Sequence, residues 1–227
     1  MSSLGMLALA SAAFVGTHFL MSHPLRAGMI AKLGERGFAG VYSLVSLLTF
    51  GWMIWAYPDA SAEAPQPYWD AGRWGYAFAT LLMWLGSVLF VGSLRRNPAL
   101  PRPGKAIERI DDPRGVFSIT RHPMMWGFAL WAATHAIVNP TAASLILTSA
   151  IAFLALVGAA LQDAKKERLL GEVWRDWRSK TSFIPYGRGF KSADGFALLF
   201  GTILWLAASW AHGALGGMPA GVWAFLG

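Results

Sequence analysis

The sequence predicts an all-α fold: a polytopic transmembrane bundle of about six helices, forming a single domain over residues 1–227. Three observations support this prediction. Of the 227 residues, 55% are hydrophobic and only 14% are charged, whereas a soluble domain usually carries about 25% charged residues. Six apolar stretches contain no Asp, Glu, Lys or Arg. The basic residues gather in alternate loops between those stretches.

The apolar stretches are each close to the roughly 20 residues that a membrane-spanning helix needs. They are Leu4–Met21, Phe38–Tyr57, Gly75–Leu94, Met124–Val138, Thr141–Leu161 and Phe196–Ala211. No Lys or Arg precedes the first stretch, so we expect a retained helix and not a cleaved signal peptide. The fourth stretch is short. We expect its helix to begin before Met124, or to form a tight hairpin with the fifth around Asn139-Pro140.

The charge pattern predicts the orientation. The first, third and fifth loops carry three, seven and eight basic residues, which is 18 of the 19 in the chain. The positive-inside rule places these loops in the cytoplasm and both termini on the non-cytoplasmic side. The net charge of +7 is then explained by the anionic inner leaflet of the bilayer, and no nucleic-acid partner is predicted. We expect Lys165–Arg178 to continue the fifth helix, with Trp174 and Trp177 as interfacial anchors.

Histidine is the main candidate for chemistry inside the membrane, because the spans carry no charged side chain. The chain has no cysteine, which excludes disulfides, zinc–thiolate sites, iron–sulfur clusters and cysteine nucleophiles. His18, His135 and His212 lie in predicted spans, while His23 and His122 stand at loop borders, each followed by proline. An ionisable residue at membrane depth is a functional hypothesis by default.

Neutral imidazole is a ligand for haem iron, zinc, copper and nickel. His135 follows Trp131 by four residues and Phe128 by seven, and His18 follows Phe14 by four. Each histidine therefore shares a helix face with flat aromatic side chains, which suits a haem held between two helices. The alternative is that each histidine only hydrogen-bonds a carbonyl of a neighbouring helix.

A second candidate site is the run Ile119–Gly127, which contains Arg121-His122-Pro123 at a predicted cytoplasmic helix entry. Gly127 would allow close approach of another helix or of a ligand. Glu167 and Arg168 could pair with the Arg121 region. The alternative is an interfacial helix start with Arg121 bound to lipid phosphate.

Separated motifs along nearly the whole chain resemble the NnrU family of bacterial membrane proteins. They are Gly16-Thr17-His18 through Leu25-Arg26, Leu33–Phe38, Val41–Ser46, Arg121-His122-Pro123 with Trp126-Gly127, Leu130-Trp131-Ala132, His135 and Asn139, and finally Trp177, Lys180-Thr181-Ser182 and Ile184-Pro185. The resemblance implies the inner (cell) membrane of a bacterium and a link to denitrification and nitric oxide metabolism.

The plant and cyanobacterial ζ-carotene isomerase is similar to this family, and the similarity implies a b-type haem held by two histidines. The matching positions are His18 and His135, the latter thirteen residues after the Arg-His-Pro histidine. We expect Trp131 beside the haem, and Arg121 and His122 near its propionates or at the cytoplasmic entrance. His23, His122 and His212 compete as ligands, because the predicted topology puts His18 and His135 at different depths. A hydrophobic small molecule and a redox partner in the membrane are the implied partners.

Two other functions stay open. The Arg-His-Pro and Glu…Pro pattern is similar to membrane methyltransferases of the isoprenylcysteine carboxyl type, which use S-adenosylmethionine; Gly127 and Glu167 are the matching positions. The third alternative is a non-catalytic scaffold of a respiratory complex. Whether the protein is an enzyme, a haem-dependent isomerase or a redox protein is therefore not decided by the sequence.

Overall fold

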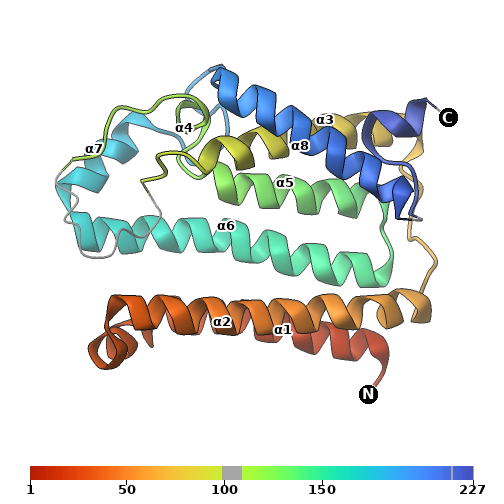
Figure 1. The fold of residues 1–227 in the computed structure, drawn as a ribbon, viewed down its shortest axis with the longest axis horizontal. Coiled ribbons are helices and arrows are strands. Elements are labelled where there is room, and N and C mark those ends of the chain that lie inside the picture. Colours follow the sequence, from red (N-terminus) through yellow and green to blue (C-terminus); the bar gives the residue numbers. More distant parts are fainter. Residues whose placement is uncertain (99–108, 216, 227) are drawn as a thin grey trace. The chain divides into compact units, whose positions relative to one another are not determined.

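The computed structural model describes residues 1–98, 109–215 and 217–226, and these residues form eight α-helices and one 3-10 helix with no β-strand (Figure 1). The predicted all-α class is confirmed. The chain divides into two compact units, Met1–Asp70 with Asn139–Leu154, and Ala71–Val138 with Ala155–Gly227. Helix α6 (Ala142–Leu170) begins in the first unit and ends in the second.

The first unit is built on two long helices that lie side by side, α1 (Ser3–Ser22) and α2 (Arg26–Glu63). The Ser2 hydroxyl caps α1 by accepting from the Gly5 amide at 3.1 Å. The Glu63 carboxylate at the end of α2 accepts from the amides of Ser3 and Leu4, so it satisfies further free donors at the start of α1. The predicted loop before Phe38 is mostly helical: α2 begins at Arg26 and consists of two helical pieces that meet at Gly34, where the backbone is not helical and φ is 69°.

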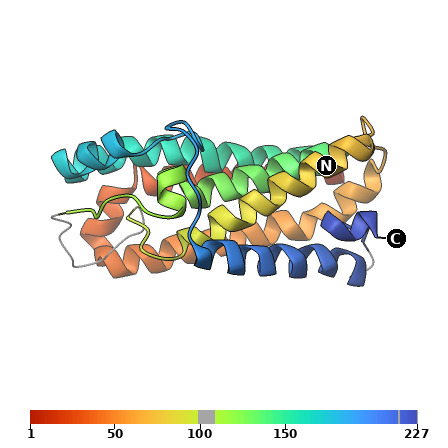
Figure 2. The ribbon, with the colours of Figure 1, turned by 90° about the horizontal axis from the view of Figure 1, so that it is seen from above.

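The second unit is built around α3 (Gly72–Ser93), which contacts α5 (Pro123–Val138) and α8 (Gly195–Ala214) (Figures 1 and 2). The 3-10 helix η1 (Gly221–Phe225) lies against α3 and α8. Glycine makes the closest helix contacts. A Cβ on Gly127 would lie 3.0 Å from the Gly86 carbonyl oxygen, and one on Gly201 would lie 2.6 Å from the Cα of Val88. These positions let the helix backbones approach closely.

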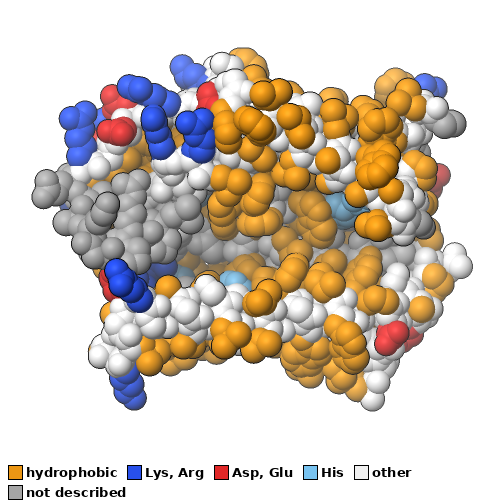
Figure 3. All heavy atoms as spheres, in the orientation of Figure 1, with side chains coloured by type: hydrophobic (Ala, Val, Ile, Leu, Met, Phe, Trp, Pro, Cys, Tyr) orange, Lys and Arg blue, Asp and Glu red, His pale blue; other side chains and the backbone are white. Residues whose placement is uncertain are grey.

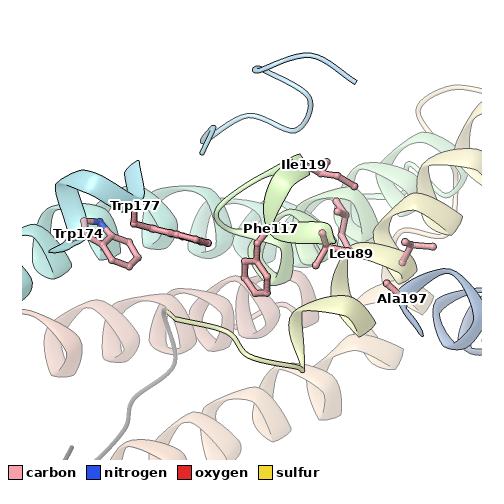
Figure 4. Packing of buried hydrophobic residues seen from close by; sticks show 8 residues of the cluster. Leu89, Phe117, Ile119, Trp174, Trp177 and Ala197 are labelled. Carbon is pink, nitrogen blue, oxygen red and sulfur yellow. The ribbon is translucent and has the colours of Figure 1, made fainter. Parts of the chain in front are cut away.

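Buried aromatic side chains fill the end of the second unit that holds the short helices α4 (Val116–Ile119) and α7 (Glu172–Lys180). Trp174 and Trp177 are almost fully buried, and the Trp177 indole points toward Phe117, with ring centroids 6.3 Å apart (Figure 4). The prediction that these tryptophans are interfacial anchors is therefore wrong. The predicted continuation of the fifth helix into the charged segment is correct as far as Leu170 and wrong beyond it, because the chain turns at Gly171, where φ is 53°, and α7 begins at Glu172.

Five of the described helices are long and apolar enough to cross a membrane: α1, α2, α3, α6 and α8. The remaining predicted stretch, the fourth, is α5, whose 16 residues begin one position before Met124. Figure 3 shows hydrophobic side chains exposed over the α8 region, and Lys and Arg side chains gathered at the α7 end of the same unit. This distribution is that of a polytopic membrane protein, whose exposed apolar helix surface faces lipid.

Candidate functional site

The Arg-His-Pro motif lies where α5 begins, at a junction between two chain segments. Pro123 is the first helical residue, a position at which its missing N–H costs nothing. The Arg121 amide donates to the Ser182 carbonyl at 2.8 Å, and the Tyr186 amide donates to the Ile119 carbonyl at 3.0 Å. The Thr120 hydroxyl adds a bond to the Phe183 carbonyl at 2.7 Å. The loop after α7 is thus fixed to the start of α5.

The two charged side chains of the motif share one carboxylate. The guanidinium of Arg121 donates to Oδ2 of Asp163 at 2.7 Å through Nε and at 2.6 Å through Nη2. The Nε2 atom of His122 lies 2.9 Å from Oδ1 of the same residue. The three side chains are 10%, 1% and 8% exposed for Arg121, His122 and Asp163. We name this group the buried ionic cluster; it connects the start of α5 to the end of α6.

The hydrogen bond to Asp163 determines which nitrogen of His122 carries a proton. An ionised carboxylate only accepts, so Nε2 of His122 must be the donor. Nδ1 of His122 is buried and has no hydrogen-bond partner among the described residues. Phe183 covers the cluster: its ring lies 5.4 Å from the Arg121 guanidinium and 5.4 Å from the imidazole of His122. Nε2 of His122 is therefore used inside the protein, and Nδ1 is buried, so neither nitrogen is open to a ligand.

The partner of the motif differs from the one expected. Asp163, one helical turn before Glu167, pairs with Arg121, while Glu167 forms ion pairs with Arg178 and, at 3.8 Å, with Arg175. Asp163 is the first charged residue after the fifth apolar stretch. A lone carboxylate at that border was the available sequence signal for the cluster.

His18 and His135 have the same local geometry in their separate units. Nδ1 of His18 lies 2.7 Å from the Phe14 carbonyl oxygen, and Nδ1 of His135 lies 2.8 Å from the Trp131 carbonyl oxygen. A carbonyl oxygen only accepts, so Nδ1 carries the proton and Nε2 keeps its lone pair. Metal-ligating histidines commonly donate their second ring nitrogen to a carbonyl in this way.

Aromatic rings surround both histidines. In the first unit, the rings of Phe14 and Tyr42 lie 4.4 and 5.4 Å from that of His18. In the second unit, the indole of Trp131 lies 4.2 Å from the ring of His135. The predicted proximity of Trp131 and His135 is confirmed. Both imidazoles are half-buried on apolar helices.

The structure also brings His135 and His212 together within the second unit, with ring centroids 6.1 Å apart. His212, on α8, likewise has Nδ1 within 2.8 Å of a carbonyl oxygen, that of Ala208. His212 is therefore a second histidine with a lone pair on Nε2. The described part of the chain contains no group of three or more His, Asp or Glu residues that could hold a metal ion; two histidines are enough for axial ligation of a haem.

The residues matched to the methyltransferase pattern have other roles here. Gly127 lies against the backbone of Gly86 and the side chain of Phe90, so its surface contacts α3. Glu167 pairs with arginines of α7. Both positions therefore serve contacts within the second unit.

One of the comparisons with known proteins gives a match, to a single family. The model of the NnrU protein family matches residues 6–220, which is nearly the whole chain. No curated protein and no solved structure matches. The family match crosses both units and contains the histidines and the buried ionic cluster. The chain belongs to the NnrU family of membrane proteins.

Proposed function

We propose that this protein binds a b-type haem within the membrane, with His18 and His135 as the axial ligands. The observation that carries the proposal is the ring geometry of these histidines. Each gives its Nδ1 proton to the carbonyl four residues earlier in its own helix and keeps the Nε2 lone pair. Such a hydrogen bond fixes the tautomer and the ring orientation, and it raises the basicity of the ligating nitrogen.

The chemistry of the donor set fits this cofactor better than a free metal ion. Haem iron receives four ligands from the porphyrin, so the protein needs to supply only one or two. The aromatic rings beside His18 and His135 offer flat apolar surfaces for a macrocycle. His212 is the competing second ligand, because its ring already lies beside that of His135.

The proposal extends to the role of the protein in the cell. A b-type haem held by His18 and His135 would supply one-electron redox chemistry. This arrangement suits a redox sensor or a redox-gated isomerisation of a hydrophobic substrate, linked to nitrogen-oxide metabolism as the family resemblance implies. The buried ionic cluster would then hold the base of α5, and with it His135, in a fixed register.

The topology is part of the same proposal. We place the protein in the bacterial inner membrane with both termini outside the cytoplasm, because the loops that contain Arg26, Arg121 and Lys180 carry most of the positive charge. Fusions of green fluorescent protein and of alkaline phosphatase at the C-terminus test this orientation. We expect phosphatase activity without fluorescence. Fluorescence without phosphatase activity would place the C-terminus in the cytoplasm.

The experiment for the cofactor uses the purified protein in detergent. We expect a Soret absorption band, and we expect it to be lost or shifted to a high-spin position in His18→Ala and in His135→Ala. His23→Ala is the matched control, because it removes a histidine close to His18 and should leave the band unchanged. Loss of the band in His212→Ala but not in His18→Ala would show that His212, and not His18, is the second ligand. A colourless wild-type protein that binds S-adenosylmethionine would overturn the proposal.

A further inference from the structure

An open cavity of about 770 Å³ lies in the second unit, away from the histidines and from the buried ionic cluster. Three segments form most of its wall: the end of α3 with the residues after it, the segment before α4, and the first turn of α8; Phe117 of α4 and Trp177 of α7 complete it. Four arginines line it: Arg95, Arg96, Arg109 and Arg114. We name it the arginine cavity.

The carboxylates of the arginine cavity are largely engaged elsewhere. Asp112 accepts from Nζ of Lys180 at 3.0 Å, and this hydrogen bond lowers the pKa of Asp112. Asp194 caps α8 by accepting from the Ala197 amide at 3.0 Å. Asp111 is the third carboxylate in the wall. Asp112 also attracts Arg109 and Arg114, but the four arginines outnumber the three carboxylates of the wall.

The guanidinium groups, by contrast, keep their hydrogen-bond donors. Within the described residues, none of the four forms an ion pair or a hydrogen bond with another side chain. Arg95 lies over the ring of Phe196 at 4.5 Å, a contact that uses the face of the guanidinium and leaves its N–H edge open. A forked guanidinium edge matches the oxygens of a phosphate group.

The framework beside these arginines is tightly fitted. A Cβ on Gly115, where φ is 57°, would lie 2.1 Å from a carboxylate oxygen of Asp194. A Cβ on Gly92 would lie 2.5 Å from Val116 and 2.8 Å from Ala197. The three wall segments are thus held against one another. Gly195 and Phe196 add the start of a 20-residue helix, whose N-terminal dipole favours an anion.

We propose that the arginine cavity binds a phosphate group, of an anionic phospholipid or of a soluble phosphate. The surroundings suit a lipid headgroup: Phe196 and Trp177 line the cavity, and Leu94, Leu198 and Leu199 beside it expose apolar surface on which acyl chains can lie. The cavity also lies among the basic loops that the charge pattern assigns to the inner leaflet. A bound phosphate would join the end of α3 to the start of α8.

The test compares two lipids with the same acyl chains, one with a phosphoglycerol headgroup and one with a bare hydroxyl. The full-length protein in neutral detergent is incubated with dioctanoyl phosphatidylglycerol or with dioctanoylglycerol, and bound lipid is counted by native mass spectrometry. We expect about tenfold preference for the phosphate lipid and a loss of about tenfold in Arg96→Gln/Arg114→Gln. The matched control Arg36→Gln/Arg168→Gln removes the same charge from two exposed arginines outside the cavity and should bind as wild type.

A second measurement needs no variant, so it decides the question even if the double variant does not fold. Phenylglyoxal modifies exposed arginines, and peptide mapping reads each site. We expect phosphatidylglycerol to protect Arg95, Arg96, Arg109 and Arg114, and to leave Arg168 reactive. Equal protection by inorganic phosphate alone would assign the cavity to a soluble phosphate. The proposal would be overturned if neither phosphatidylglycerol nor inorganic phosphate changed the reactivity of the cavity arginines. It would also be overturned if the cavity variant and the control variant lost lipid binding to the same extent.

Discussion

His135 lies on α5 and His122 lies immediately before it, yet their environments assign them opposite roles. The Nε2 of His122 is engaged by a carboxylate in a nearly buried ionic cluster. The Nδ1 of His135 is engaged by its own helix, and Nε2 keeps its lone pair. Each imidazole has one engaged nitrogen, but His122 is 1% exposed and bonded to a carboxylate, whereas His135 is half-buried and bonded to a carbonyl. Burial and the kind of partner together separate the structural histidine from the candidate ligand.

The largest effect on stability should come from breaking the buried ionic cluster. Asp163→Ala leaves the buried Arg121 guanidinium without its partner, so we expect the free energy of unfolding to fall by about 3–5 kcal/mol. Thermal unfolding in detergent measures this. Asp112→Ala removes an exposed carboxylate that also pairs with a basic residue, and it should change the unfolding temperature little. Equal losses in the two variants would show that burial of the cluster does not matter.

The next effect concerns α5, the helix that carries His135 and begins just after His122. Gly127→Ala places a Cβ 3.0 Å from the Gly86 carbonyl oxygen and from the Cβ of Phe90, so α5 must move away from α3. We expect a loss of about 1–3 kcal/mol. Gly16→Ala in α1 is the matched control, since no described atom outside its own helix backbone and chain neighbours lies within 4 Å of the new Cβ. A neutral Gly127→Ala would mean that the α3–α5 contact is looser than described.

A smaller effect should come from the loop that covers the cluster. The Trp126 indole donates to the Phe183 carbonyl at 2.8 Å, and Trp126→Phe removes this bond while it keeps an aromatic ring. We expect a loss of about 1 kcal/mol, read from thermal unfolding. In Trp205→Phe the indole nitrogen removed has no partner in the described structure, so the loss should be smaller. The reverse order would contradict the role given to the loop.

The smallest effect is a pH dependence at the surface. Hydrogen bonding from Lys180 lowers the pKa of Asp112. This pair therefore stabilises the folded protein at pH values above the ordinary carboxyl pKa. That contribution is lost as the pH falls through the lowered pKa. The difference in unfolding temperature between wild type and Asp112→Asn should therefore narrow on acidification, as thermal scans over that pH range measure. A difference that widens would have the wrong sign for this pair.

The sequence was sufficient for the helical class because apolar stretches without charge, such as Phe38–Tyr57, have few alternatives to a membrane helix. It could not locate the cluster, because Asp163 lies 42 residues from Arg121 and its pairing depends on how α5 and α6 meet. Trp174 and Trp177 were assigned to the interface for a similar reason: their burial comes from α4, which is far away in sequence. The proximity of His135 to His212 also depends on the contacts of α8, which no local pattern contains.

The most direct test of the account compares His122→Ala with His135→Ala in one set of purified samples. Electron paramagnetic resonance of the oxidised protein reports whether haem iron has two histidine ligands. We predict a low-spin signal in the wild type. The signal should persist in folded His122→Ala, whose thermal stability is lowered, and it should be lost or become high-spin in His135→Ala. Retention of the low-spin signal in His135→Ala, together with its loss in folded His122→Ala, would contradict the account.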